Sequence, residues 1–338
     1  SNSWVVSGEH TKSGKPLLAN DPHLSAQMPS VWYQMGLHCR ELTETCSYDV
    51  TGFTFSGVPG VIIGHTDKIA WGFTNLGPDV ADLFLEQVDD KTYLYQGERV
   101  PLETREERIE VAGGEPVTIT VRSTRHGPLI NEVMGQVKPT GEANAVALSW
   151  TALMPGRTAD AIFALNEAGD WHEFRAAAAL FEVPAQNLVY ADTAGNIGYQ
   201  APGRIPVRRA GDGTVPAPGW TGEFDWNTAP IPYDQLPSVH NPPEGFVVTA
   251  NNAVIDPSRY RPLLTQDWSY GYRSQRILDM LREEIGKGQL DAATMARMQL
   301  DNRNLFAETL IPSLMAVDLA GPSKDARALL DGWDGSQD

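Results

Sequence analysis

The chain has 338 residues with 41% hydrophobic and 20% charged side chains, which provides enough apolar material for a globular protein with a sizeable core. Asp and Glu outnumber Lys and Arg by 43 to 26, and the resulting formal net charge of −17 argues against nucleic acid as a partner. No apolar stretch approaches the length of a membrane span, so we expect none.

The distribution of β-branched, aromatic and turn residues predicts sheet in the first part of the chain and helix in the last. Short apolar runs separated by Gly, Pro, Asn and Asp predict strands from Trp4 to about Trp150. The elements expected after them are a helical stretch over 158–181, strands over 187–199, an irregular Pro/Gly-rich loop over 203–218, a strand over 246–249 and helices from about residue 270. The loop is long enough to suggest a functional or ligand-holding role. This order predicts an α+β arrangement with helices packed outside the sheets.

The first residue, Ser1, carries both a nucleophile and a base. Its hydroxyl lies beside its own α-amine, whose ordinary pKa of about 7.7–8.0 leaves a useful fraction unprotonated near neutral pH. Taken alone the feature is weak, because every chain begins with some residue and Ser-Asn is also a common remnant of tag removal.

The two cysteines, Cys39 and Cys46, are too few for a disulfide framework. Their spacing is compatible with one small loop-closing disulfide or with two buried thiols, and geometry decides between these. His38 lies beside Cys39, but no second histidine-cysteine pair is near, which argues against a zinc site.

The usual hydrolase and nucleotide-binding signatures are absent from the sequence. It contains no G-x-S-x-G, S-x-x-K, H-E-x-x-H, Walker or G-x-G-x-x-G motif. Polar clusters do interrupt otherwise apolar strands, at 20–23, 71–75, 125–128 and 250–252. Buried polar groups must be hydrogen-bonded, so these clusters are structural networks or parts of a site.

The ordered motifs of the chain resemble those of one family. They are Ser1-Asn2-x-Trp4-Val5-Val6-x-Gly8, Leu18-Ala19-Asn20-Asp21-Pro22-His23-Leu24, Tyr48-Asp49-Val50-Thr51-Gly52, Ala70-Trp71-Gly72-Phe73-Thr74-Asn75, Asn187-x-x-Tyr190-Ala191-Asp192 and Pro216-x-Pro218-Gly219-Trp220. In this order, from the first residue to about Arg273, the chain resembles the β chain of the penicillin acylases, which are N-terminal-nucleophile amidohydrolases.

The resemblance implies a fold, a partner and a location. The expected fold is a four-layer αββα sandwich, with two antiparallel sheets between helical layers. Residues 1–338 would form the N-terminal and central part of the β chain of a single catalytic domain. In the family a precursor cuts itself and exposes the new N-terminal serine, so the expected partner is an α chain from the same precursor, giving a heterodimer. The signal peptide would then lie on the α chain, and the expected location is periplasmic or secreted.

The family mechanism implies roles for five residues. Ser1 Oγ would attack an amide carbonyl, with its own amine as base directly or through one water, and the acyl-enzyme would then be hydrolysed. The backbone N–H of Asn75 and the side-chain amide of Asn251 would bind the oxyanion. His23 would lie beside Ser1 and touch it through a backbone carbonyl or the imidazole, and Arg273 would orient Asn251. The alternative for His23 is a histidine that satisfies strand-edge groups, and the alternative for Arg273 is a surface salt bridge. His65 and His126, beside glycine turns, are expected in strand-end packing, and no organic cofactor is expected.

A structural calcium ion is also implied by the resemblance. Its ligands would be the carboxylates of Asp79 and Asp82 and backbone carbonyls of Ala81 and Gly213, all hard oxygen donors. The pattern departs from the family at one ligand, because Pro262 stands at the position of an expected aspartate, with Asp256 and Asp267 only nearby. An ordinary solvated acidic turn is the alternative.

The substrate implied is a small N-acyl molecule with an apolar acyl group. Leu24 and Ile63 correspond to acyl-pocket positions, and both are aliphatic. The expected function is therefore amide hydrolysis of the penicillin acylase type. One alternative is an acyl-homoserine lactone or lipopeptide acylase with the same Ser1 chemistry. A more distant one is a non-catalytic, calcium-stabilised binding module outside the cytoplasm.

Overall fold

The protein is described by a computed structural model over residues 1–337, and Asp338 lies outside the described residues. The strands are β1 (Asn2–Val6), β2 (Leu17–Asp21), β3 (Trp32–His38), β4 (Asp49–Phe55), β5 (Ile63–His65), β6 (Ile69–Asn75), β7 (Ala81–Glu86), β8 (Thr92–Tyr95), β9 (Glu98–Pro101), β10 (Glu103–Ile109), β11 (Val117–Thr124), β12 (Gly127–Pro128), β13 (Ala145–Trp150), β14 (Gln186–Asp192), β15 (Ile197–Gln200), β16 (Ala217–Pro218), β17 (Ser238–His240) and β18 (Phe246–Thr249). The helices are α1 (Thr158–Glu167), α2 (Trp171–Ala178), α3 (Tyr272–Lys287), α4 (Ala292–Gln299), α5 (Leu305–Met315) and α6 (Pro322–Ala328).

The N-terminal strand β1 is the central strand of a three-stranded antiparallel sheet in the order β18-β1-β2. Strand side chains alternate between faces, so Trp4 and Val6 point to one side and Val5 to the other. Trp4 and Val6 pack in one core cluster with Ile277 and Leu281 of α3. Val5 instead packs against Val189 and its neighbours in the second sheet. The first strand of the chain is therefore buried on both faces.

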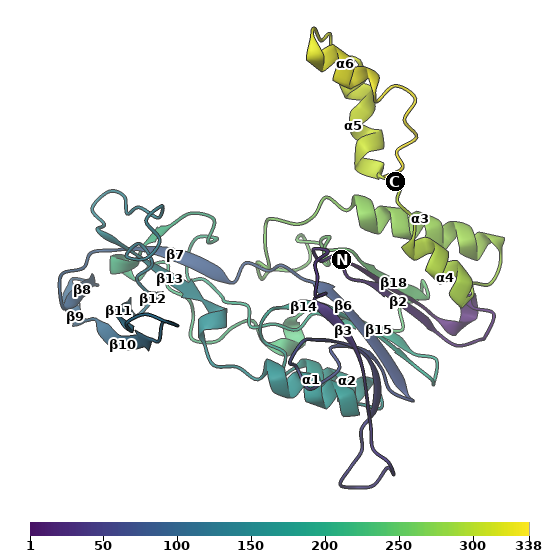
Figure 1. The fold of residues 1–338 in the computed structure, drawn as a ribbon, viewed down its shortest axis with the longest axis horizontal. Coiled ribbons are helices and arrows are strands. Elements are labelled where there is room, and N and C mark those ends of the chain that lie inside the picture. The colour runs from purple at the N-terminus through teal and green to yellow at the C-terminus, as the bar shows by residue number, and fades with distance from the viewer. Residues whose placement is uncertain (338) are drawn as a thin grey trace.

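The second sheet has seven strands in the order β17-β15-β14-β6-β5-β4-β3. Its outer face carries Trp71 and Tyr190, which pack with Leu165 of α1 and Phe174 of α2 in the largest described core cluster. Figure 1 shows α3 and α4 beside the sheet of β1, and α1 and α2 beside the seven-stranded sheet. The predicted α+β arrangement with helices outside the sheets is confirmed by the elements that the structure contains.

The local predictions hold with two refinements. The helical stretch expected over 158–181 is two helices, because the chain breaks at Gly169 and Asp170 caps α2 by accepting a hydrogen bond from the Glu173 N–H. The Pro/Gly-rich segment 203–218 is irregular except for the two-residue strand β16. Strands β7 to β13 form smaller sheets beside the main body, at the left of Figure 1. None of the helices within residues 1–337 is long and apolar enough to cross a membrane.

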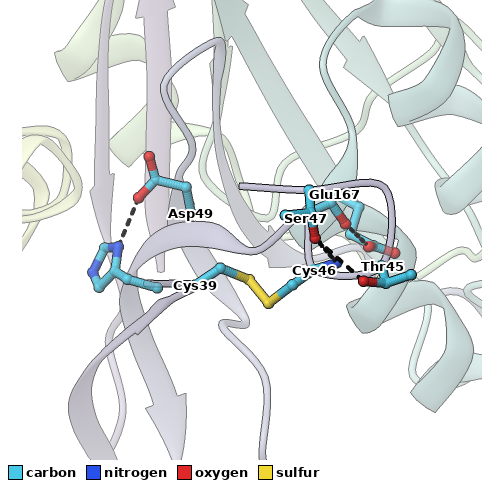
Figure 2. Close-up of a disulfide and its surroundings, with 8 residues drawn as sticks. Cys39, Thr45, Cys46, Ser47, Asp49 and Glu167 are labelled. Carbon is cyan, nitrogen blue, oxygen red and sulfur yellow. Dashed lines mark hydrogen bonds and ion pairs between the residues drawn. A yellow bond between two sulfur atoms is a disulfide. The ribbon is translucent and has the colours of Figure 1, made fainter. Parts of the chain in front are cut away.

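Cys39 and Cys46 form a disulfide, which settles the alternative that the sequence left open. It closes the loop between β3 and β4, and Figure 2 shows it near Asp49, the residue that pairs with His38. The His38 ring has partners on both nitrogens, with Nδ1 at 2.6 Å from Asp49 Oδ1 and Nε2 at 3.3 Å from Thr51 Oγ1. This histidine therefore orders the hairpin and offers no free ring nitrogen to a metal.

Candidate active site

Strand pairing brings the ends of distant segments to the first residue. Asn2 lies opposite Asp21 in the β1–β2 register, and Ser3 lies opposite Thr249 in the β1–β18 register. The residues that continue from these pairs are Ser1, His23 and Asn251, so they meet at one end of the sheet. Arg273, the second residue of α3, reaches the same end.

Ser1 has three partners from three segments. Its amine donates to Asn251 Oδ1 at 3.1 Å, and its Oγ accepts a hydrogen bond from the backbone N–H of His23 at 3.2 Å. Its carbonyl accepts from Arg273 Nη1 at 2.8 Å. With Oγ accepting from His23, the Ser1 hydroxyl hydrogen is free to point toward another acceptor.

The side chain of Asn251 is oriented by two donors, the Ser1 amine and the Arg273 guanidinium. Its Oδ1 accepts from the Ser1 amine and from Arg273 Nη2, the latter at 2.8 Å, which forces the amide NH2 to the opposite side. That Nδ2 donates to the carbonyl oxygen of Asn75 at 2.8 Å. Asn251 has φ of 65°, a left-handed conformation that is uncommon for residues other than glycine. The structure thus brings the two predicted oxyanion asparagines together, through the Asn75 carbonyl oxygen.

His23 contacts Ser1 through its backbone N–H, and the expected contact through its carbonyl or imidazole is absent. The ring is turned away because its Nε2 lies 2.8 Å from Asp21 Oδ2, a carboxylate that also accepts from Asn2 Nδ2 at 3.3 Å. No role for Asp21 or Asn2 was predicted from the sequence. The signal in the sequence is the two-residue spacing of Asp21 and His23, which places both side chains on the same face of a strand. The register of β1 and β2 then places Asn2 opposite Asp21.

Asn20 is a third residue for which the sequence predicted no role. Its side-chain Oδ1 accepts from the Phe73 N–H at 3.0 Å, and its Nδ2 donates to the Asn2 carbonyl at 3.0 Å. This ties β1 and β2 to β6, the strand that ends at Asn75. Gly72 permits the approach, because a Cβ there would lie 2.8 Å from Asn20 Oδ1.

The environment of Ser1 favours the neutral amine. Burial, and to a smaller extent the nearby Arg273 charge, lower the pKa of the Ser1 amine to about 6, although Asp21 opposes both. Burial and a like charge both disfavour an ammonium ion. Near neutral pH most Ser1 amines are therefore unprotonated and able to accept a proton from the adjacent hydroxyl.

An apolar cavity of about 560 Å³ lies between β2 and the seven-stranded sheet. Its lining includes Asn20 and Pro22 next to the Ser1 contacts, together with Phe53, Ile63 and Trp71. Ile63 thus lies in the lining of this cavity. Leu24 is not in the lining and is 51% exposed, because it lies beyond the end of β2, where strand pairing no longer directs the side chain.

The residues predicted to hold calcium do come together, but they do not fit the ion. Asp79, Asp82 and Gly213 meet around the guanidinium of Arg208, which lies 2.7 Å from Asp82 Oδ1 and 3.2 Å from Asp79 Oδ2. A cation already occupies the space between the carboxylates. Among residues 1–337, no group of three or more His, Cys, Asp or Glu side chains is arranged to hold a metal.

Of the remaining predicted ligands, Ala81 joins this cluster through its backbone hydrogen bond to Asp79. Ala81 is an exposed residue that begins β7 and pairs with Trp150. The segment after Pro262 reaches Asp79 only through the Leu264 carbonyl, which accepts from the Asp79 N–H at 2.7 Å. Asp256 accepts from Ser258 in its own turn.

His126 lies in a buried ionic cluster away from Ser1. Its Nδ1 is 2.7 Å from Glu86 Oε1 and its Nε2 is 3.0 Å from Asp225 Oδ1, and the ring stacks on Phe84. Burial alone would raise the pKa of Asp225, yet hydrogen bonds from His126 and Tyr95 hold it below its ordinary value. The turn between β11 and β12 is thus fixed by hydrogen bonds between buried polar side chains, whereas the sequence predicted only packing. His65, at the end of β5, lines the edge of the apolar cavity.

Comparison with known proteins finds similarity over the whole chain. The family model described as penicillin amidase matches residues 1–338. An acyl-homoserine lactone acylase, QuiP of Pseudomonas aeruginosa, is 32% identical over 97% of the chain and 40% of its own length. Penicillin acylase 2 proenzyme of Pseudomonas sp. strain SE83 is 32% identical over all of the chain and 42% of its own length. The solved thermostable penicillin G acylase of Alcaligenes faecalis superimposes with a TM-score of 0.79 at 27% identity, over 99% of the chain and 59% of that chain. The chain therefore spans less than half the length of these curated relatives.

The Ser1 amine is expected to titrate near pH 6, because burial and Arg273 disfavour its charged form. The measurement is the pH dependence of its reaction with an amine-selective acylating reagent, read by mass spectrometry of the N-terminal peptide. Asp21→Asn removes the opposing negative charge and should lower this pKa further. The matched control is Asp279→Asn, on the exposed side of α3, which should leave the titration unchanged. A midpoint near 8 in the unchanged protein would contradict the prediction.

Proposed function

Because the chain belongs to the penicillin amidase family, we propose that it hydrolyses an N-acyl amide bond through an acyl-enzyme formed on Ser1. The observation that carries the proposal is the arrangement of Ser1 against Asn251, with a half-buried amine of lowered pKa beside the hydroxyl. An N-terminal hydroxyl needs no separate histidine when its own amine is neutral and adjacent.

The reaction follows from these contacts. Ser1 Oγ attacks the amide carbonyl carbon while its proton passes to the Ser1 amine, directly or through one water. The resulting ammonium then donates that proton to the leaving amine as the carbon–nitrogen bond breaks. Water next attacks the ester carbonyl carbon while the amine again accepts a proton. The amine returns this proton to Oγ as the carbon–oxygen bond breaks, and the carboxylic acid is released.

Asn251 is the proposed side-chain donor to the oxyanion. Its Nδ2 carries two N–H groups, and one is committed to the Asn75 carbonyl, which leaves the second for the substrate oxygen. The backbone N–H of Asn75 is the proposed second donor. Arg273 acts as a positioning residue, because it holds Asn251 Oδ1 and so directs the amide. The backbone N–H of His23 helps to hold Ser1 Oγ in place.

The cavity supports an apolar acyl group on the substrate. Its volume of about 560 Å³ is in the range of small-molecule pockets, and Phe53, Ile63 and Trp71 contribute apolar surface. Aromatic acyl groups such as that of penicillin G and long aliphatic chains both match this lining. The second candidate function, acyl-homoserine lactone hydrolysis, is favoured by the similarity to QuiP and uses the same Ser1 chemistry.

The proposals on fold and assembly also rest on membership of the penicillin amidase family. We infer that the two sheets and their outer helices are the four layers of an αββα sandwich, and that residues 1–338 belong to one catalytic domain of a β chain. The proposed partner is an α chain from the same precursor, and the proposed location is periplasmic or secreted. The limited coverage of the relatives supports a longer precursor.

Covalent labelling tests whether Ser1 is a nucleophile at all. Phenylmethylsulfonyl fluoride should add its sulfonyl group to Ser1 Oγ, detected as a mass increase of the N-terminal peptide. Ser3→Ala is the matched control, because the neighbouring Ser3 is buried and bonded to the Ala19 carbonyl, and labelling should persist without it. An unlabelled Ser1 would favour the non-catalytic binding module.

Replacement of Asn251 should reduce turnover without unfolding the protein. Asn251→Ala is expected to lower kcat by about 10²–10³, the usual effect of losing one oxyanion donor. Asn251→Gly removes the same donor and also relieves the left-handed backbone at this position, so it should lose equal activity with no loss in Tm. Near-full turnover in either variant would exclude Asn251 as a donor.

The acyl specificity can be tested by kcat/KM for penicillin G and for a long-chain acyl-homoserine lactone. Ile63→Asp should raise KM for the preferred substrate by about tenfold or more, because an apolar contact of this kind contributes about 1–3 kcal/mol. Leu24→Asp is the control, since Leu24 is exposed outside the cavity, and should change KM little. Equal losses in both variants would mean that the acyl group binds elsewhere.

A further inference from the structure

The cluster around Arg208 contains a buried cation held by acidic side chains from separate segments. The Arg208 side chain is 5% exposed and that of Asp82 is 7% exposed. Asp79 and Asp212 add two further carboxylates that act electrostatically on the guanidinium. A buried charge requires a partner of opposite sign, so each member of this cluster depends on the others.

The guanidinium makes the contacts of a structural cation. Its Nε donates to Asp82 Oδ2 at 2.8 Å and its Nη2 to Asp82 Oδ1 at 2.7 Å, a two-pronged pair that fits a planar carboxylate. The same Nη2 lies 3.2 Å from Asp79 Oδ2 and 3.4 Å from the Asp79 carbonyl oxygen. These four oxygens are the kind of donor that a calcium ion takes.

Gly213 and Trp226 pack directly against the ion pair of Arg208 and Asp82. A Cβ at Gly213 would lie 2.3 Å from Asp82 Oδ1 and 2.6 Å from Arg208 Nε, so the loop packs directly onto the ion pair. The Trp226 indole N–H donates to Asp82 Oδ2. A calcium ion at 2.3–2.6 Å from the same carboxylate oxygens would overlap the guanidinium and be repelled by its charge.

The cluster joins three parts of the chain. Asp79 and Asp82 belong to the segment that follows β6, Arg208 and Gly213 to the loop 203–218, and Gln266 reaches the same loop by donating to Asp212 Oδ2 at 2.8 Å. One guanidinium is thus shared by the carboxylates of Asp79 and Asp82.

We propose that the Arg208 guanidinium takes the place of calcium as the structural cation of this cluster, and that its removal turns the same oxygens into a divalent-cation site. The stability that the cluster provides then comes from the chain itself and does not depend on calcium in the medium.

The test measures Tm and terbium luminescence on the complete processed protein, so that its outcome is independent of catalytic activity. Tm is recorded in EDTA and in excess Ca²⁺ for the unchanged protein, for Arg208→Ala and for Arg209→Ala. Arg209 is the matched control, because it is an adjacent, half-exposed arginine whose nearest acidic partner, Asp225, lies 3.7 Å away. Terbium is excited through tryptophan, and Trp226 is the indole in contact with Asp82.

The unchanged protein should have the same Tm in EDTA and in Ca²⁺. Arg208→Ala should lose several degrees of Tm in EDTA, recover part of them in Ca²⁺, and gain terbium luminescence that disappears when Trp226→Phe is added. Arg209→Ala should show none of these responses. If Arg208→Ala does not fold, the proposal is tested by comparing Tm in EDTA and in Ca²⁺ for the unchanged protein and for Asp82→Asn.

Two results would overturn the proposal. One is a calcium-dependent Tm of the unchanged protein that is lost in Asp82→Asn, because calcium would then already bind here. The other is a folded Arg208→Ala variant whose Tm and luminescence ignore added cations, because the cluster would then not be a cation site.

Discussion

The candidate site depends on the guanidinium of Arg273, because this one side chain holds the first residue and its partner loop together. Nη1 donates to the Ser1 carbonyl at 2.8 Å and to Asn2 Oδ1 at 2.7 Å, and Nη2 donates to Asn251 Oδ1 at 2.8 Å. The backbone of a chain terminus is ordinarily free to fray. Here a side chain 272 positions away fixes it, and the orientation of the Asn251 amide follows from the same contacts.

The same arginine sets the electrostatics of the amine. It places a positive charge near Ser1, which together with burial favours the neutral amine, while Asp21 acts in the opposite direction. A base with a pKa far below the working pH would accept a proton poorly, and one far above it would already be protonated. The balance at about 6 leaves the Ser1 amine both available and able to accept a proton.

The sequence was sufficient to predict the strands and helices, and to predict the site residues that belong to ordered motifs. Ser1, Asn251 and Arg273 stand in ordered motifs, and the structure brings them within hydrogen-bond distance although strands and loops separate them. The sequence was insufficient where the role of a residue depends on the direction in which its side chain points. Leu24 and Ile63 are both aliphatic, but only Ile63 is oriented by a strand toward the cavity. Arg208 went unnoticed because nothing local in an irregular loop indicates that it meets carboxylates more than a hundred residues earlier.

The two arginines, Arg208 and Arg273, act on the two sides of Asn75. The Asn75 carbonyl accepts from Asn251, which Arg273 orients, and from Asn187 Nδ2 at 3.2 Å. Four residues later the chain is anchored again at Asp79, by Arg208 and by the Leu264 carbonyl. A short segment fixed at both ends has little freedom to move its backbone amides, and oxyanion stabilisation requires donors that are already in position before the reaction. A guanidinium supplied by the chain would maintain this anchor at any calcium concentration, so the geometry proposed for catalysis would not depend on a metal that can dissociate.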